Sequence, residues 1–593
     1  MVRASTPSSN AKTRQNKRGS SPPPTLSTLL DSRRARFIAI GASLLLQWII
    51  FPPVDYWPLA YVCFVPWILV LGADNNAHRA YVLSYVLGLA FFAITMRWLY
   101  LVTIPGAIIL FAAMALYYPL VACPIRHVMR RRRIPLAVVF PAVWTGCEAL
   151  RSMVAPRFPW CLVGHSQHSV LSMIQICDVT GAYGVSFVVA AVNGFVVDLV
   201  LVRLGRPCAV TPPRPIYLRT SAAFTACVLA TCLAYGGYRL ATSNPTDGPR
   251  IAIIQGNYPN YVDEERARNS PTMTQRADRY FELVARAARD KPDLFLLPET
   301  PWIMYLNRGF IEQPLTRWYA DTYTPQECYN AFTRIAREYH AYVVTGSTSL
   351  ELTPLDVRAS ERRYNSAFVF PPDGGPPQRY DKMHLVFIGE YVPFRYGPLR
   401  FFYLWINRIM PFGGPDYEYS LTPGHTPRIF ALKARSQNNR LYRFATPICY
   451  ENVMPYLSRA FVAADGAKRC DFLLNLSNDG WFAHSSEQPQ HLAASVFRAV
   501  ENRVGVARAV NTGISCFIDP DGRVHDTVSR NGVVVGPGVD GYRVARVKLD
   551  DRLTLYSRFG DVLAIICAGI WGVFYLDYIL ARIRESRKQA EHE

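Results

Sequence analysis

The chain has 593 residues, too many for one compact core, and half of them are hydrophobic while 18% are charged. This balance is typical of a membrane protein and excludes a small soluble domain. The formal charge of +20 lies mainly outside residues 250–560, where 38 Lys and Arg oppose 32 Asp and Glu. A basic surplus in the apolar part indicates cytoplasmic loops rather than a nucleic-acid groove, so no nucleic-acid partner is expected.

Residues 1–36 are polar and basic, with Ser and Pro runs that predict a disordered cytoplasmic tail. No small-residue cleavage site follows, so the first apolar run is expected to be an uncleaved span. Runs of roughly 20 apolar residues have the length that a bilayer core requires, and their number disfavours core helices of a large soluble protein. The predicted spans are 37–54, 57–73, 80–99, 102–123, 134–153, 184–203, 219–240 and 561–582.

The Lys and Arg residues of the short loops orient these spans. With the basic tail inside, the loops after the fourth and sixth spans also lie inside, and both are basic. Seven spans in residues 37–240 then place residues 245–560 on the outer, periplasmic face, and the helix 561–582 returns the chain to a basic tail at 583–593. We therefore expect a multi-pass protein of the cell inner (cytoplasmic) membrane with both termini cytoplasmic.

Residues 245–560 alternate strand-like and helical runs, the pattern of an α/β domain. Neither a phosphate-binding glycine loop nor a metal-ligand spacing of the thirteen cysteines is present, so no cofactor and no metal are expected. A disulfide among Cys328, Cys470 and Cys516 stays open if the domain faces an oxidising compartment. The predicted strands are 250–255, 293–299, 341–346, 366–370, 441–446 and 470–475, with a helix at 273–289.

Three polar residues, Glu299, Lys382 and Cys449, each follow the end of an apolar strand. Because strand ends on one edge of a sheet converge, the three could share one pocket. There a carboxylate can take the proton of a thiol, and a lysine can stabilise an oxyanion together with the backbone N–H of Tyr450. Each residue alone has an ordinary structural explanation: a buried thiol, a capping carboxylate and a solvated charge.

The segments around these residues resemble the carbon–nitrogen hydrolase (nitrilase) superfamily. Because spans lie on both sides, residues 37–582 resemble its membrane-embedded family, the apolipoprotein N-acyltransferases. The three main motifs are Leu296-Leu297-Pro298-Glu299, Tyr380-Asp381-Lys382-Met383-His384 with Gly389-Glu390-Tyr391-Val392-Pro393, and Ile448-Cys449-Tyr450-Glu451. Further similar segments are Gln255-Gly256-Asn257, Phe158-Pro159-Trp160, Ser477-Asn478-Asp479-Gly480-Trp481-Phe482, Pro489-Gln490-His491-Leu492 and Asn511-Thr512-Gly513-Ile514-Ser515.

The resemblance implies a polytopic α-helical membrane domain plus an α/β nitrilase-like αββα sandwich with a Glu-Lys-Cys triad. In this family an acyl chain passes from a phospholipid, through a cysteine thioester, to the α-amine of the S-diacylglyceryl cysteine of an apolipoprotein, the last step of lipoprotein maturation. Its partners would be the phospholipid, the apolipoprotein and the bilayer, with the enzyme a monomer. The resemblance implies that Cys449 is the nucleophile, Glu299 the proton acceptor and Lys382 the oxyanion stabiliser. It also implies that Glu390 is a supporting carboxylate and that Tyr450 and Glu451 line the substrate pocket.

Two stretches depart from the family pattern. The segment after Asn257 lacks the tryptophan that is typical of the family there, so its gating residue cannot be assigned. The stretch 400–419 follows no family motif but is strongly apolar before its glycines. We predict a mobile lid at the membrane interface, where Trp and Tyr are favoured, and a buried core segment is the alternative. The residues of this possible lid are Phe401, Phe402, Trp405 and Phe412.

Two other functions remain open. A membrane-anchored amidase of the nitrilase type would release the acyl group to water, although one span would be enough to anchor it. A transport or scaffold protein would carry an inactive hydrolase-like domain. The intact Glu299, Lys382 and Cys449 disfavour that second alternative, as does the absence of internal charges of the kind expected for an ion path.

Overall fold

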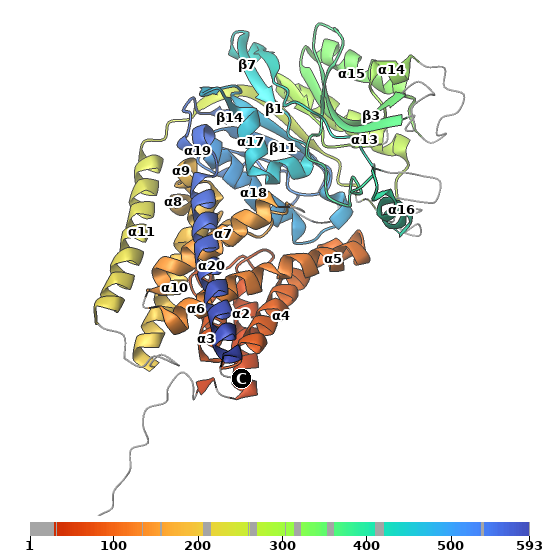
Figure 1. Ribbon diagram of the computed structural model, residues 1–593. Coiled ribbons are helices and arrows are strands. Elements are labelled where there is room, and N and C mark those ends of the chain that lie inside the picture. The colour runs from red at the N-terminus through yellow and green to blue at the C-terminus, as the bar shows by residue number, and fades with distance from the viewer. Residues whose placement is uncertain are drawn as a thin grey trace, which may run out of the picture.

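The computed structural model has a helical domain and, stacked on one end of it, a domain of two β-sheets (Figure 1). The first contains the chain up to helix α11 and the C-terminal helix α20, and the second contains the residues between these two helices. The structure describes residues 29–30, 32–132, 134–154, 157–204, 215–258, 260, 270–302, 304–312, 322–352, 361–395, 397–409, 420–534, 536 and 539–591.

Each predicted span overlaps a helix of the helical domain. Among the described residues, five helices have the length and composition of a membrane span: 77–95, 104–131, 182–204, 216–241 and 562–590. Local sequence sets where these helices begin, because Asn76 accepts a hydrogen bond from the backbone N–H of Arg79 and Thr103 caps the next helix in the same way. The helices are α2 (Arg33–Ile49), α3 (Val65–Ala73), α4 (Ala77–Thr95), α5 (Ile104–Ala115), α6 (Tyr117–Arg131), α7 (Leu136–Met153), α10 (Ala182–Leu204), α11 (Pro215–Ala241) and α20 (Val562–Ala590).

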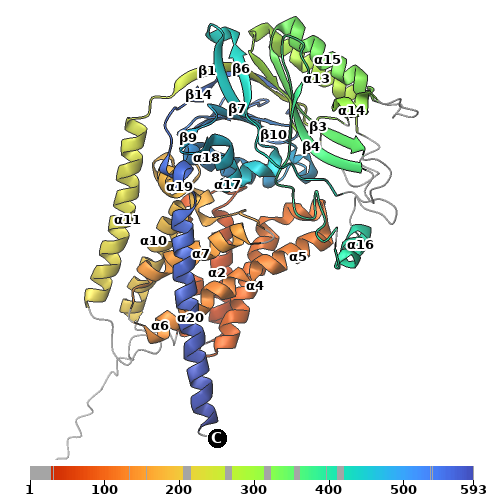
Figure 2. The ribbon, with the colours of Figure 1, turned by 45° about the horizontal axis from the view of Figure 1, so that its top comes forward.

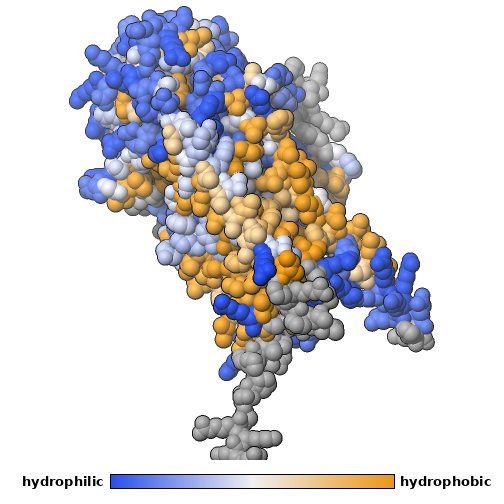
Figure 3. Space-filling model, turned by 90° about the vertical axis from the view of Figure 1, so that its left-hand side faces the viewer, coloured by the Kyte–Doolittle hydropathy of each residue, from blue (hydrophilic) through white to orange (hydrophobic). Residues whose placement is uncertain are grey.

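The surface separates into two zones along the long axis of the molecule. Hydrophobic side chains cover much of the helical domain, whereas the sheet domain is largely hydrophilic (Figure 3). Exposed apolar residues are frequent on α20, where Ile565, Val573 and Leu576 are each more than half exposed. A broad apolar surface of this kind requires an apolar environment, which a bilayer supplies.

The sheet domain contains two six-stranded sheets. The first has the order β14-β1-β2-β3-β4-β5, and β1, β2 and β3 are parallel to one another. Its strands are β1 (Thr246–Gln255), β2 (Leu294–Leu296), β3 (Tyr342–Leu352), β4 (Glu361–Phe370), β5 (Gln378–Asp381) and β14 (Gly541–Leu549). The second has the order β13-β12-β11-β10-β7-β6, made of β6 (Phe430–Ala434), β7 (Arg440–Ala445), β10 (Phe472–Ser477), β11 (Gly505–Val510), β12 (Cys516–Ile518) and β13 (Val524–His525).

Alternating side chains place these sheets face to face between two helical layers. On β1, Ile251 and Ile253 join the core shared with the second sheet, whereas Ala252 and Ile254 join the core under α13 (Met273–Ala287) and α15 (Pro325–Tyr339). This period of two follows from the strand geometry. The helices α17 (Pro455–Val462) and α18 (Glu487–Asn502) cover the second sheet and face the helical domain (Figure 2). The predicted fold class, with an αββα sandwich, is therefore confirmed.

The three cysteines that could have formed a disulfide are free thiols. Cys328, Cys470 and Cys516 are all buried, and none is bonded to another cysteine. They are small hydrophobic residues of the core, and the option of a disulfide is not realised.

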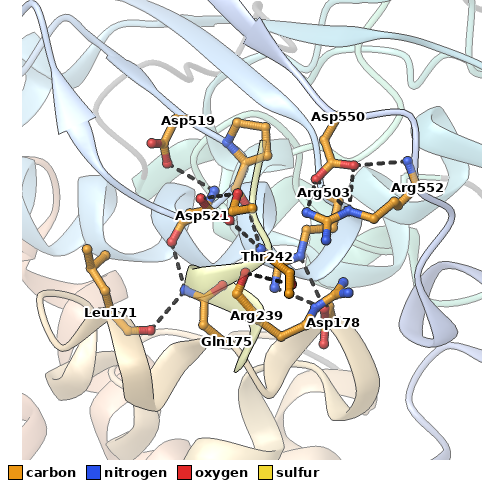
Figure 4. A network of polar contacts seen from close by, with 12 residues as sticks. Leu171, Gln175, Asp178, Arg239, Thr242, Arg503, Asp519, Asp521, Asp550 and Arg552 are labelled. Carbon is orange, nitrogen blue, oxygen red and sulfur yellow. Dashed lines mark hydrogen bonds and ion pairs between the residues drawn. The ribbon is translucent and has the colours of Figure 1, made fainter. Parts of the chain in front are cut away.

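A buried ion network joins the two domains (Figure 4). Asp178, on the short helix α9 (Cys177–Thr180), accepts hydrogen bonds from Arg503 at 2.9 and 3.1 Å and pairs with Arg239 of α11 at 2.5 Å. Arg503 also pairs with Asp521 at 2.7 Å, and both side chains are fully buried. A buried charge is unfavourable unless an opposite charge lies beside it. Removing Arg503 or one of its acidic partners alone should therefore lower the stability of the protein.

Replacing Arg503 by Leu is therefore expected to destabilise the protein by about 3–5 kcal/mol, because Asp178 and Asp521 lose their shared cation. Thermal unfolding of the full-length protein in detergent measures this change. Arg523→Gln is the matched control, since Arg523 also contacts Asp521 at 3.2 Å but its side chain is 48% exposed. The control should change stability by less than about 1 kcal/mol. If the two variants lost the same amount of stability, the assigned role of Arg503 would be contradicted.

Candidate active site

Three strand ends carry the residues predicted for catalysis, but they belong to two sheets. Glu299 follows β2 and Lys382 directly follows β5, both in the first sheet, whereas Cys449 follows β7 of the second. The expectation that all three share one edge of one sheet was therefore wrong for Cys449. Sequence alternation shows which residues face inward, but it does not show to which sheet a strand belongs. The three residues meet at the seam between the stacked sheets, and the charges of Glu299 and Lys382 act on the thiol of Cys449.

Lys382 lies between two carboxylates. Its side chain is 1% exposed, and Nζ is 2.9 Å from Glu390 Oε1 and 3.4 Å from Glu299 Oε1. Burial alone lowers the pKa of Lys382, but Glu299 and Glu390 raise that pKa above its ordinary value, so the side chain stays an ammonium ion. The site thus contains a fixed positive charge near the sulfur.

The two carboxylates are themselves held in place. Asn365 of β4 donates from Nδ2 to Glu299 Oε1 at 2.6 Å and to Glu390 Oε1 at 2.9 Å. The other oxygen of Glu390 accepts the backbone N–H of Val386 at 2.8 Å. Sequence reasoning missed Asn365, because a single Asn in a strand carries no specific signal. Its amide bridges Glu299 and Glu390 and therefore orients both around Lys382.

Cys449 begins a short turn of 3-10 helix, η6 (Cys449–Val453), and has φ of +51°. A non-glycine residue in this left-handed region stores strain of order 1–3 kcal/mol, which is typical of functional sites. Burial raises the pKa of the Cys449 thiol well above its ordinary value, Glu299 raises it further and Lys382 lowers it. The resting sulfur is therefore a neutral thiol, and it needs a base to become a nucleophile.

Glu451 ties the loop of Lys382 to the turn of Cys449. Its Oε1 accepts hydrogen bonds from Tyr380 Oη at 2.7 Å, Met383 N at 2.6 Å and His384 N at 3.1 Å, and its Oε2 accepts one from Ile448 N at 2.8 Å. Burial raises the pKa of Glu451 to about 7, against the lowering effect of the Ile448 N–H and of Lys382. The side chain is fully buried, so it shapes the site from beneath the two loops.

Tyr450 connects the same turn to the helical domain. Its ring is stacked on Trp160, with an interplanar angle of 11° and centroids 6.3 Å apart, and on Phe158 at 5.8 Å. Its hydroxyl donates to the backbone oxygen of Arg157 at 3.2 Å. The Phe158-Pro159-Trp160 motif of the sequence therefore lies beside the residue that follows Cys449.

A second polar cluster, formed by Asp479, Glu487 and His491, lies in the same domain. Asp479 accepts hydrogen bonds from Ser477 at 2.7 Å and from the buried Arg508 at 2.9 Å, and it lies 3.1 Å from His491 Nδ1. Among the described residues, Asp479, Glu487 and His491 form the group whose donor atoms are close enough to hold a metal ion. Arg508 already neutralises Asp479, however, so the charge of this cluster does not call for a metal.

The apolar stretch after residue 399 forms helix α16 (Arg400–Ile409). Phe401, Phe402 and Trp405 are 60, 44 and 59% exposed, whereas Tyr403 between them is buried. Phe412 lies outside the described residues. The alternative of a wholly buried core segment is therefore wrong for the described part of this stretch.

Comparison with known sequences agrees with this architecture. The profile of the apolipoprotein N-acyltransferase N-terminal domain matches residues 43–195, and that of carbon-nitrogen hydrolase matches residues 250–536. The apolipoprotein N-acyltransferase of Geobacter metallireducens is 32% identical over 90% of this chain and 93% of its own length. Apolipoprotein N-acyltransferase 2 of Treponema pallidum is 29% identical, covering 78 and 79%, and the Pseudomonas putida enzyme is 28% identical, covering 90 and 95%.

The two stacked sheets and the second of these profiles define the class of the sheet domain, the carbon–nitrogen hydrolases. The helical domain and the full-length relatives narrow this class. The chain belongs to the apolipoprotein N-acyltransferase family.

Replacing Glu451 by Gln tests its role in joining the two loops. The amide places an –NH₂ group against backbone N–H donors, so at least one buried donor loses its acceptor, at about 1–3 kcal/mol. We expect lower thermal stability and slower acyl transfer. Glu312→Gln is the control, since Glu312 is 60% exposed and its ion pair is with Arg308 of the short helix just before it, α14 (Arg308–Ile311). A Glu451→Gln protein as stable and as active as the control would contradict the prediction.

Proposed function

We propose that the protein transfers a fatty acyl chain from a membrane phospholipid to the N-terminal S-diacylglyceryl cysteine of an apolipoprotein. The observation that carries the proposal is the convergence of Glu299, Lys382 and Cys449 at the seam of the two sheets, where Tyr450, the residue after Cys449, packs on Trp160 of the apolar helical domain. The full-length relatives that bear the name apolipoprotein N-acyltransferase support the same activity.

In the first half-reaction, Glu299 takes the proton of the Cys449 thiol, and the thiolate attacks the ester carbonyl of the phospholipid. The Lys382 ammonium and the backbone N–H of Tyr450 stabilise the oxyanion of the tetrahedral intermediate. When the intermediate collapses, the ester C–O bond breaks. The leaving lysophospholipid oxygen takes the proton from Glu299, and the acyl chain stays on Cys449 as a thioester.

In the second half-reaction, the neutral α-amine of the apolipoprotein attacks the thioester carbonyl. Glu299 accepts a proton from the attacking nitrogen, and Lys382 again stabilises the oxyanion. Collapse breaks the C–S bond and forms the amide. The Cys449 thiolate regains the proton from Glu299, so the enzyme returns to its starting state without any external reductant or cofactor.

We place the protein in the bacterial inner membrane, with the helices of residues 37–240 and 561–582 as spans. The basic loops would then lie in the cytoplasm with both termini, and the sandwich of residues 245–560 on the periplasmic face. The apolar surface of the helical domain supports this arrangement (Figure 3). No oligomer is needed to complete the site, since all three catalytic residues come from one chain.

We also propose that α16 contacts the membrane interface. The helix lies at the periphery, near the end of α5 that points away from the other helices, in both ribbon views (Figures 1 and 2). The exposed rings of Phe401, Phe402 and Trp405 can enter the headgroup region, where aromatic residues are favoured. The helix would then cover the lipid entrance to the site as a lid.

Removal of the nucleophile tests the proposed function directly. Cys449→Ala should abolish acyl transfer from phospholipid to a diacylglyceryl peptide, and Lys382→Ala should lower it by about 10²–10³-fold, because the oxyanion loses its cation. Cys227→Ala is the control, since Cys227 is an exposed thiol on α11, and it should keep wild-type activity. Full transfer by Cys449→Ala, or release of free fatty acid with no acylated peptide, would rule out this function.

If α16 acts at the membrane interface, changing its exposed aromatic residues should lower the rate of acyl transfer more with vesicles than with substrate in detergent. The triple change of Phe401, Phe402 and Trp405 to Ser should lower transfer from phospholipid vesicles by about threefold or more, with smaller loss for short-chain phospholipid in detergent. Leu441→Ser is the control, because Leu441 is 58% exposed on β7. This strand lies in the part of the sheet domain that points away from the helical domain (Figure 1). Equal losses in vesicles and in detergent would argue against an interfacial lid.

A further inference from the structure

Gln490, in the first turns of α18, makes four N–H···O hydrogen bonds to the helical domain, and Cys161 Sγ lies 4.0 Å from its Oε1. Its Oε1 accepts from the indole N–H of Trp160 at 2.9 Å and from that of Trp98 at 3.1 Å. Its Nε2 donates to the backbone oxygens of Pro52 and Thr95, both at 3.1 Å. The amide therefore uses two donors and two acceptor sites, the full capacity of the side chain. Gln490 is 5% exposed, so water cannot substitute for a lost partner.

The partners of Gln490 come from three separate segments of the helical domain. Pro52 follows α2, Thr95 ends α4 with Trp98 just behind it, and Trp160 lies in the loop after α7. The two indoles are in contact, with centroids 5.2 Å apart. One amide of the sheet domain thus fixes where these segments meet beneath the active site.

Trp160 transmits this position to the nucleophile turn. Its ring lies nearly parallel to that of Tyr450, at 11°, and Tyr450 directly follows Cys449. The backbone N–H of Tyr450 is the oxyanion donor in the proposed reaction. A rotation of the Trp160 ring would remove the surface on which Tyr450 rests.

The same helix also supports the other end of the turn. Ser495 Oγ accepts a hydrogen bond from Asn452 Nδ2 at 2.6 Å, and Arg498 donates to the backbone oxygen of Val453 at 2.9 Å. All of these side chains are buried. The turn that begins with Cys449 is therefore held directly by α18 at its end and through Trp160 at its beginning.

We propose that Gln490 is a positioning residue for acyl transfer, which it serves by holding Trp160 against Tyr450 beside the nucleophile. This inference rests on the proposed function. Gln490 itself touches neither the reacting groups nor the triad in this arrangement. Its effect passes through the indole N–H of Trp160, whose ring is stacked on Tyr450, whereas the equivalent bond reaches Trp98, whose ring packs on Trp160 and on Phe482.

A double-mutant cycle on the full-length enzyme tests this route. The rate of thioester formation on Cys449 is measured by intact mass in a single turnover, with saturating vesicles of phosphatidylethanolamine and phosphatidylglycerol. Gln490→Leu and Trp160→Phe should each slow it by about tenfold or more, since small misplacements near a reacting centre have effects of this size. In the Trp160→Phe background, Gln490→Leu should slow thioester formation by no more than about a further twofold.

Trp98→Phe is the matched control, because it removes the other indole N–H from the same oxygen. In that background Gln490→Leu should still slow thioester formation by about the same factor as in the wild type. If Gln490→Leu does not fold, the single variants carry the test: Trp160→Phe should be at least about threefold slower than Trp98→Phe.

The inference would be overturned if Gln490→Leu slowed thioester formation by the same factor in the wild-type and Trp160→Phe backgrounds. It would also be overturned if Trp160→Phe and Trp98→Phe formed the thioester at equal rates. A wild-type enzyme that forms no thioester would overturn the proposed function instead, and this inference with it. The two failures are therefore distinguishable.

Discussion

A buried ammonium ion is the constraint on which the active site depends. Lys382 is almost completely removed from solvent, and a charge in that position is tolerated only if carboxylates surround it. Glu299 and Glu390 provide these carboxylates, and Asn365 orients both by donating a hydrogen bond to each. The strands β2, β4 and β5 must therefore deliver these side chains to one point, and that point lies beside the sulfur of Cys449 at the seam of the two sheets.

The turn that begins with Cys449 depends on a second set of contacts, some of which reach across the domain boundary. Glu451 ties the Cys449 turn to the loop that carries Lys382, and Tyr450 rests on the aromatic side chains of the helical domain. The ion network around Arg503 joins the two domains elsewhere (Figure 4). A sandwich that acts on dissolved substrates would not need such contacts, whereas an enzyme acting on a membrane lipid needs its sulfur at a fixed height above the bilayer.

Sequence patterns predicted much of this arrangement because they report local rules. Strand-like runs predicted β7 and β10 to within two residues, whereas β1 begins earlier than predicted, at Thr246, and β2 is shorter than predicted, at Leu294–Leu296. The motifs around Glu299, Lys382 and Cys449 identified residues that the structure brings together. The same patterns placed Cys449 on the wrong sheet, since alternation does not encode which strands pair. They also missed Asn365 and the contacts of Gln490, because each depends on segments that are distant in sequence and adjacent only after folding.

The central claim is that the acyl chain passes through Cys449. Intact-mass analysis of the wild-type enzyme after incubation with phospholipid alone tests it most directly. The account predicts a mass increase of one acyl chain on Cys449, labile to hydroxylamine, that disappears when a diacylglyceryl peptide is added and reappears as acylated peptide. Efficient transfer without any adduct on Cys449, or an adduct that water discharges and the peptide does not, would contradict it.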